Sequence, residues 1–191
     1  MPSTRDLDLE SSFPALLSFG YEITSEKTLF VSHPLPYNCI AYAAGDNKRW
    51  WQYNPMRPEF FWPPVLNDGS LQSLIDAFEW IGYHASTNGN REWGKQKVAL
   101  YATVDPSTGF LYYTHAARQL FNGKWSSKCG QNHDITHSRL EAIYCPDYGT
   151  VACYMYRWWH TGLVRWLKTK TSELRGRIRS LSPPKKPSAA P

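Results

Sequence analysis

The sequence predicts an α+β fold in which a short helix that carries a cysteine packs on a small antiparallel sheet. Apolar residues over 71–81 recur at the i, i+3, i+4, i+7 spacing of an amphipathic helix. Runs typical of strands follow at 98–102, 110–120 and 124–128. Asn122-Gly123, between the last two runs, is a strong signal for a hairpin. Helices followed by an antiparallel meander are the expected order of elements.

The helix that carries the cysteine is expected at Ile40–Ala44, where good helix formers are followed by Gly45 as a natural stop. Two prolines in the preceding segment, 33–37, force that segment to be extended. Cys39 therefore lies where the helix begins. Unpaired backbone N–H groups and the helix dipole favour a thiolate at that place, which makes Cys39 the candidate nucleophile.

Three further features follow from local signals. Asp68 or Ser70 can cap the start of the longer helix, and Gly82 can end it. Another strand is expected at 150–156. Residues 46–66 form a long loop rich in aromatic residues and proline, and loops of this length inside compact domains are often functional.

The positive charge of the chain is concentrated near its C-terminus. The net charge is +5 over 191 residues. Residues 157–191 hold nine Lys or Arg and one acid, or +8, so the remaining residues carry 12 basic and 15 acidic groups, or −3. We therefore expect an α+β domain at 1–156, a basic helix at 157–182 and a disordered tail at 183–191. Specific binding of nucleic acid is not expected, whereas the basic helix could contact an anionic membrane surface or an acidic partner.

Several absences bear on location. No stretch reaches the roughly 18 apolar residues of a spanning helix, and residues 1–12 show no apolar signal segment. Four cysteines in a chain of this length do not form a disulfide scaffold. We expect a cytoplasmic protein, with peripheral contact to a membrane left open.

His115 is the candidate partner of Cys39. It lies within the run 110–120, next to small residues that leave space for a substrate or a partner side chain. An imidazole beside a thiol completes an activated nucleophile, and a third group must orient the ring. We choose Asp134 for this role; its rivals are Ser127, Asn132 and His137.

Other residues could line the same site. Gln119 shares a strand face with His115, because side chains alternate along a strand, so it could bind a substrate. Trp50, Trp51 and Trp62, in the aromatic loop, could form a wall over Cys39 or could pack in the core.

Two motifs, Asn38-Cys39-Ile40-Ala41-Tyr42-Ala43 and Thr114-His115-Ala116-Ala117-Arg118, resemble the papain-like cysteine hydrolases, and most closely the NlpC/P60 and CHAP amidase branches. This resemblance implies a papain-like fold and a Cys39–His115 site, with the Cys39 backbone N–H and Asn38 holding the oxyanion. The chain also resembles an uncharacterised, mostly bacterial family with an Asn-Cys-Ile-Ala-Trp-Ala-type motif. The residues that carry this second resemblance are Asn38–Ala43, Trp50-Trp51, Trp62-Pro63-Pro64, His115–Leu120 and Trp125–His137.

The sequence thus predicts a cysteine hydrolase that cleaves an amide, isopeptide or related acyl bond in a peptide or protein, without a cofactor. The alternative function is a non-catalytic interaction module that binds through its aromatic loop and basic segment. A zinc site is the sharpest alternative for a different set of residues, because thiolate and imidazole groups bind zinc tetrahedrally. That set is Cys129, His133, His137 and Cys145.

Overall fold

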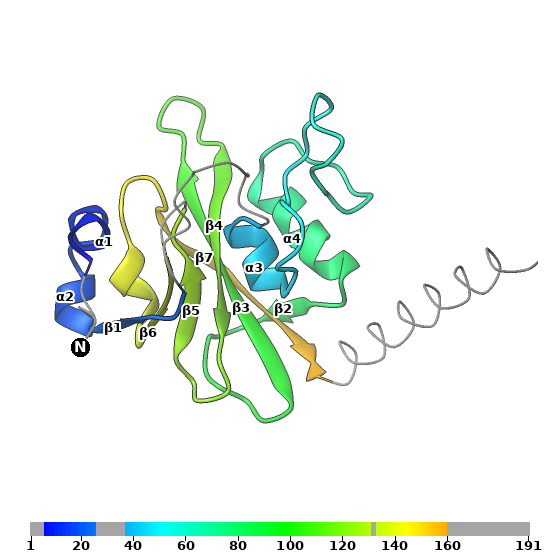
Figure 1. Ribbon diagram of the computed structural model, residues 1–191. Helices are drawn as coiled ribbons and strands as arrows, with labels where there is room; N and C mark the ends of the chain where they lie inside the picture. The colour runs from blue at the N-terminus through cyan, green and yellow to red at the C-terminus, as the bar shows by residue number, and fades with distance from the viewer. Residues whose placement is uncertain (1–5, 26–36, 131–132, 160–191) are drawn as a thin grey trace, which may run out of the picture.

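The computed structural model describes residues 6–25, 37–130 and 133–159, which form a seven-stranded antiparallel sheet (Figure 1). The strand order is β1-β6-β5-β4-β3-β7-β2. The strands are β1 (Tyr21–Ile23), β2 (His84–Ser86), β3 (Lys95–Val104), β4 (Leu111–Gln119), β5 (Trp125–Lys128), β6 (Asp134–His137) and β7 (Thr150–Trp158). The last strand lies between β3 and β2, so the sheet is not a simple meander.

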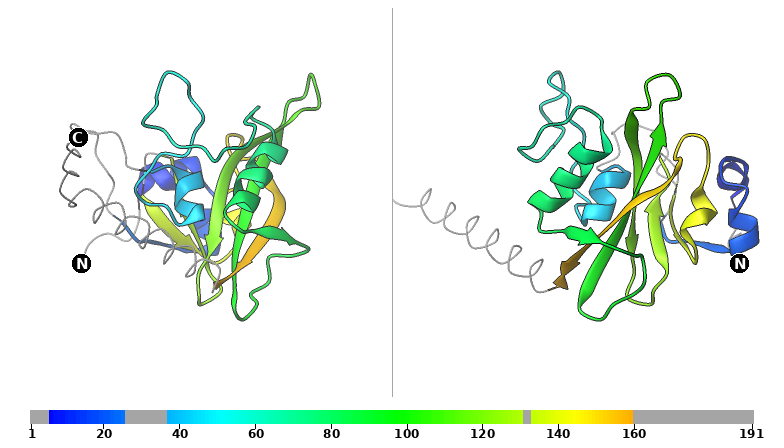
Figure 2. Two further views of the ribbon diagram at one scale, coloured as in Figure 1. Left: turned by 90° about the vertical axis from the view of Figure 1, so that its right-hand side faces the viewer. Right: turned by 180° about the vertical axis from the view of Figure 1, so that it is seen from behind.

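Short helices cover both faces of this sheet (Figure 2). One face carries α3 (Cys39–Ala44) and α4 (Leu71–Trp80). The other face carries α1 (Leu7–Ser12), α2 (Leu16–Phe19) and the 3₁₀ helix η1 (Leu140–Ile143). Each face therefore has an apolar core of its own, which we call the α3 core and the η1 core.

The expectation of an α+β, papain-like fold is wrong, because the described part of the chain is mainly sheet with a few short helices. The longest described helix, α4, has ten residues, which is no longer than the strand β3 with ten and is close to β7 with nine. Three strands that the sequence did not predict, namely β1, β2 and β6, have three or four residues each. Such short strands carry too few residues to show an alternating pattern.

The two helices of the α3 core begin and end as the sequence predicts. Of the two candidate caps for α4, Ser70 takes the role, because its hydroxyl accepts a hydrogen bond from the Ser73 N–H. Gly45 ends α3 in the left-handed conformation, with φ of 83°. Its N–H donates to carbonyl groups of the last turn of α3.

Strand β3 lies between β4 and β7 and is buried on both faces of the sheet. Val98 and Leu100 belong to the α3 core, whereas Ala99 and Tyr101 belong to the η1 core. This explains why the sequence shows a continuous apolar run here and no alternation. The strand itself extends beyond the predicted 98–102 at both ends, to Lys95 and Val104.

A bulge interrupts the pairing of β3 with β4. Tyr101 pairs with His115 and Ala102 pairs with Tyr113, which leaves Thr114 as the extra residue. The Thr114 hydroxyl donates a 2.6 Å hydrogen bond to the Tyr148 carbonyl. The bulge offsets the alternation of side chains on its two sides, so that Tyr113 lies on the α3 core although it is two residues from His115.

The expected domain boundary lies inside β7, which runs from Thr150 to Trp158 rather than ending at 156. Most of the basic helix expected at 157–182, and the whole tail at 183–191, lie outside the described residues.

Gly149 is the glycine with the closest backbone neighbour. A Cβ there would lie 2.1 Å from the Ala102 carbonyl oxygen, and φ is +66°. Gly109 has a similar φ of +72° but no atom within 4 Å of the Cβ position. We expect Gly109→Ala to lower the free energy of unfolding by about 1–2 kcal/mol, and Gly149→Ala to lower it by about 3 kcal/mol or more. Urea unfolding of both variants measures the difference, and equal losses would contradict it.

Candidate functional site

Asn38 fixes the place where α3 begins. Its side-chain oxygen accepts a 3.0 Å hydrogen bond from the Ala41 N–H, as an N-cap does. Its side-chain nitrogen donates a 2.7 Å bond to the Trp51 carbonyl. The amide therefore holds the helix and the aromatic loop together, and one of its two N–H donors is used in doing so.

Cys39 is the first residue of α3, and its side chain is partly buried against the α3 core. Burial is the largest influence on its thiol and raises the pKa to about 11. Backbone N–H groups of Ala116, Ile40 and Cys39 itself oppose this effect but do not overcome it. The thiol is therefore protonated at neutral pH.

His115 is completely buried in β4. Its ring stacks on Tyr148 with a centroid distance of 4.2 Å, and its edge meets Tyr101 at 5.3 Å. Neither ring nitrogen has a hydrogen-bond partner among the described residues. Burial, with a smaller effect from His137, lowers the pKa of His115 to about 3, so the ring is neutral at pH 7.

The structure does not join Cys39 and His115 in a hydrogen-bonded pair. The Ala116 N–H reaches the Cys39 thiol, and the Ala116 side chain lies in the α3 core. Because successive side chains of a strand point to opposite faces, His115 points away from α3 and packs on Tyr101 and Tyr148 of the η1 core. The sequence placed His115 on the correct strand but could not assign its face.

Asp134 begins β6 and lies near α3 rather than beside His115. Its carboxylate accepts a 2.8 Å hydrogen bond from the Tyr37 hydroxyl and lies 3.6 Å from the Lys128 ammonium, and both Asp134 and Lys128 are buried. Its rivals are placed elsewhere. Ser127 and His137 bond to each other at 2.9 Å, and Asn132 lies outside the described residues.

The predicted lining residues separate into two groups. Trp51 is buried in the α3 core, and Trp62 stacks on Tyr113 against the same core, so both belong to the side of the sheet that holds Cys39. Trp50 stacks on Phe60 in the outer part of the aromatic loop. Gln119 instead donates a 2.9 Å bond to the Gly89 carbonyl.

The alternative zinc ligands do not converge. Both ring nitrogens of His133 are engaged, one with the Ser25 carbonyl at 2.7 Å and the other with Asp6 at 3.1 Å. The ring of His137 is engaged by Ser127 and by the Arg139 carbonyl. Over 6–25, 37–130 and 133–159, no group of three or more His, Cys, Asp or Glu side chains is placed to hold a metal ion.

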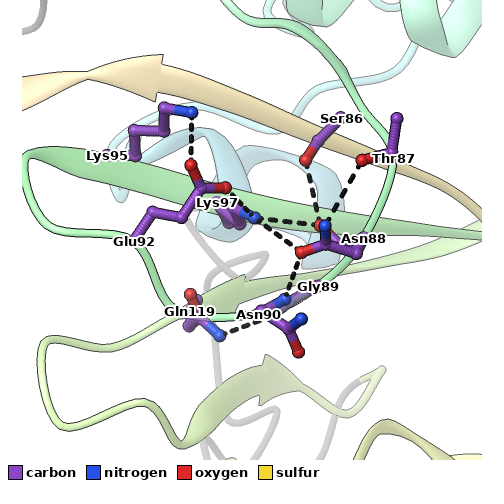
Figure 3. A network of polar contacts seen from close by, with 9 residues as sticks. All are labelled: Ser86, Thr87, Asn88, Gly89, Asn90, Glu92, Lys95, Lys97 and Gln119. Carbon is purple, nitrogen blue, oxygen red and sulfur yellow. Dashed lines mark hydrogen bonds and ion pairs between the residues drawn. The ribbon is translucent and has the colours of Figure 1, made fainter.

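A polar network that the sequence did not predict lies in the loop between β2 and β3 (Figure 3). Lys97 is fully buried, and its ammonium donates to the Asn88 carbonyl at 3.0 Å and to the Asn88 side-chain oxygen at 3.2 Å. It also forms a 2.6 Å ion pair with Glu92, whose carboxylate contacts Lys95 as well. A lysine in a strand and a polar loop gave no sequence signal for this network.

Two hollows flank the Glu92–Lys95 pair. The first is lined by aromatic and cationic side chains from the loop before β3, the turn after β4 and the end of β7. The residues that line it include Arg91, Trp93, Phe121 and Trp159. The second is open, has a volume of about 380 Å³ and is lined mainly by polar side chains. The residues that line it are Ala85, Ser86, Thr87, Asn88, Asn90, Glu92, Lys95 and Tyr156.

Large aromatic side chains around the first hollow are exposed. The exposed fractions are 87% for Trp93, 62% for Phe121 and 50% for Trp159. Arg91 lies 4.8 Å from the centroid of the Phe121 ring, and Phe121 and Trp159 contact each other at 5.1 Å. We call the surface formed by Arg91, Trp93, Lys95, Phe121, Trp158 and Trp159 the aromatic–cationic face.

The arrangement defines a β-rich domain with two surface hollows at one end of its sheet. The chain belongs to the family described as a domain of unknown function, DUF7689, whose model matches residues 23–156. No curated protein and no solved structure gives a significant match. In the part of the chain that the structure describes, no helix has both the length and the apolar character to cross a membrane.

The buried neutral His115 predicts a loss of stability in acid. Its pKa is about 3 in the folded chain against 6.5 as the unperturbed value, so the unfolded chain binds a proton first as the pH falls. The contribution is complete above pH 6.5 and is lost as the pH falls from 6.5 toward 3. Between pH 7 and pH 5, we expect the unfolding free energy of the wild type to fall by about 2 kcal/mol more than that of His115→Phe. Urea unfolding at both pH values measures it, with His84→Gln, at an exposed histidine, as the control.

The raised pKa of Cys39 predicts an unreactive thiol. We expect iodoacetamide at pH 7 to alkylate Cys39 no faster than the partly exposed Cys145, because a thiol with a pKa of about 11 contains little thiolate. Peptide mass spectrometry of a time course measures both rates, with Cys39→Ser to assign the signal. Faster alkylation of Cys39 at pH 6 would instead favour the hydrolase hypothesis.

Proposed function

We propose that this protein is a binding module that attaches to the anionic, cytoplasmic surface of a membrane through the aromatic–cationic face. One observation carries the proposal: Trp93, Phe121 and Trp159 are half or more exposed, and they surround one hollow together with Arg91. Contiguous apolar patches on a protein surface mark interaction sites, whereas single exposed aromatic residues do not.

The chemistry of this face suits a lipid interface. Tryptophan and other aromatic rings prefer the level of the lipid headgroups, and arginine and lysine attract anionic lipids. Arg91 is held against one of the rings, since its guanidinium lies 4.8 Å from the centroid of Phe121. Rings and charges therefore occupy the same surface.

The sequence that follows supports an anionic partner. Residues 160–191 contain eight Lys or Arg and one acid, or +7, and this segment begins directly after Trp159. Each basic residue near an anionic leaflet contributes about 1 kcal/mol, and this contribution falls with salt. Among anionic partners, a lipid surface is favoured over an acidic protein because it accepts the exposed tryptophans as well as the charge.

The hydrolase hypothesis stays a prediction, and the geometry does not favour it. Its two central residues point to different faces, the thiol of Cys39 is protonated, and His115, the predicted base, is not hydrogen-bonded to it. One feature still speaks for it, because backbone N–H groups surround the sulfur at the start of α3. The alkylation experiment above decides whether this feature activates the thiol.

Removal of the exposed rings is expected to weaken membrane binding. We expect Trp93→Ala combined with Phe121→Ala to reduce the affinity for phosphatidylcholine vesicles with about one third phosphatidylserine by at least about tenfold, because two apolar side chains lose their lipid contacts. Co-sedimentation of the full chain with these vesicles at two salt concentrations measures the effect. Pure phosphatidylcholine vesicles are expected to retain little protein.

The matched control replaces two exposed residues of the aromatic loop. Tyr53 and Met56 are 60% and 89% exposed but lie outside the aromatic–cationic face, so Tyr53→Ala with Met56→Ala should bind as the wild type does. Equal losses in both double variants would contradict the proposed surface. Retention on an immobilised acidic polypeptide without vesicle binding would point to an acidic protein partner and would overturn the membrane proposal.

A further inference from the structure

The loop between β2 and β3, which lines the second hollow, is held in place by side chains of the underlying sheet. The buried Lys97 ammonium donates two hydrogen bonds to Asn88 and pairs with Glu92 (Figure 3). Gln119 donates to the Gly89 carbonyl at 2.9 Å, and a Cβ on Gly89 would meet the Tyr154 ring at 2.7 Å. Burial of a lysine ammonium has a large desolvation cost, and here the hydrogen bonds of the buried ammonium fix the conformation of a surface loop. The loop is therefore preorganised, which lowers the entropic cost of binding a ligand.

The outer side of this loop offers hydrogen-bonding capacity. The Ser86 hydroxyl donates to the Asn88 carbonyl at 2.9 Å and keeps its acceptor lone pairs, and the Thr87 hydroxyl accepts from the Asn88 amide and keeps its proton. The exposed Asn90 uses its backbone N–H to bond Asn88, and its side-chain amide makes no hydrogen bond within the described ranges. Asn90 is among the residues that line the hollow, and its amide offers a donor and an acceptor.

The charged side chains of the hollow are paired. Glu92 and Lys95 both line it and form an ion pair with each other. The remaining positive charge belongs to Lys97, which is buried beneath the loop and is bonded to Asn88 and Glu92. An anion that approached Lys95 would also meet the Glu92 carboxylate. Tyr156 adds one apolar wall. Hydrogen bonding and shape, rather than charge, would select a ligand here.

We propose that this second hollow binds a neutral polyhydroxylated ring, such as a hexose unit. Neighbouring hydroxyl groups on such a ring each donate and accept, which matches the amide of Asn90 and the hydroxyls of Ser86 and Thr87, while the C–H groups of the ring pack on Tyr156. The second hollow differs in chemistry from the first, although both hollows are lined in part by Glu92 and Lys95. The hexose belongs either to a soluble glycan or to a glycolipid head group.

Titration of the ¹⁵N-labelled full chain with neutral methyl hexosides tests the proposal. The panel is methyl glucoside, methyl galactoside and methyl mannoside, with glucose 6-phosphate as the charged comparison. We expect saturable shifts of the Asn88 and Asn90 side-chain amide signals for at least one hexoside, with a Kd of about 1 mM, as for a small ligand with few contacts. Binding of the phosphate alone would overturn the choice of a neutral ligand.

Asn90→Ala is the diagnostic variant, because its side chain supports no other described contact. We expect it to weaken hexoside binding by at least about tenfold, with an unchanged circular dichroism spectrum. Gln72→Ala, at an exposed amide on α4, is the matched control and should bind as the wild type does. Equal binding by Asn90→Ala and the wild type would overturn the site.

A second arm separates the two sources of the ring and keeps the result independent of the membrane proposal. Uncharged phosphatidylcholine vesicles that carry a neutral hexosyl glycolipid are mixed with the Trp93→Ala, Phe121→Ala chain, with and without Asn90→Ala. Binding of soluble hexosides assigns the site to a free glycan, whereas retention only on glycolipid vesicles, lost in Asn90→Ala, assigns it to a head group. If neither form binds, the proposal is wrong even where the aromatic–cationic face still holds anionic vesicles.

Discussion

The burial of β3 on both faces is the constraint on which the rest of the structure depends. Val98 and Leu100 pack under α3 and α4, while Ala99 and Tyr101 pack under η1. Because the two cores share one strand, each side chain of the neighbouring strand β4 is assigned to one core or the other. That assignment places His115 on the opposite face of the sheet from Cys39. No other feature of the sequence argues against a pairing of these two residues.

Two buried side chains that carry nitrogen, Lys97 and His115, differ in how far their polar atoms are hydrogen-bonded. Lys97 lies at the edge of the buried run, and three oxygen atoms from Asn88 and Glu92 surround its ammonium. His115 lies in β4, where its ring stacks on Tyr148, meets Tyr101 in an edge contact and makes no hydrogen bond within the described residues. A buried group that is fully bonded shapes its surroundings, whereas a buried group without bonds lowers stability as it titrates.

The features that the sequence predicted correctly are those fixed by neighbouring residues. The Ser70 cap, the Gly45 stop and the Asn122-Gly123 turn each depend on residues within a few positions of each other. By contrast, β1 forms because Tyr21–Ile23 pairs with Ile135–His137 of β6, more than 100 positions away, and no local sequence pattern predicts that pairing. The same limit applies to the candidate site, since the strand of His115 was predictable and its face was not.

Different interactions are expected to drive binding at the two surface hollows, although the hollows share an ion pair. Lys95 is the cation that both hollows touch, and Glu92 already neutralises it, so it adds little net charge to either. The positive charge available to an anionic surface therefore comes from Arg91 and from the basic sequence after Trp159. Salt screens such charges over about 10 Å at 0.1 M but leaves neutral hydrogen bonds largely unaffected. Binding at the aromatic–cationic face should therefore depend strongly on ionic strength, whereas binding at the second hollow should depend on it weakly. The Glu92–Lys95 salt bridge, which lies between the two, is the reason for this difference.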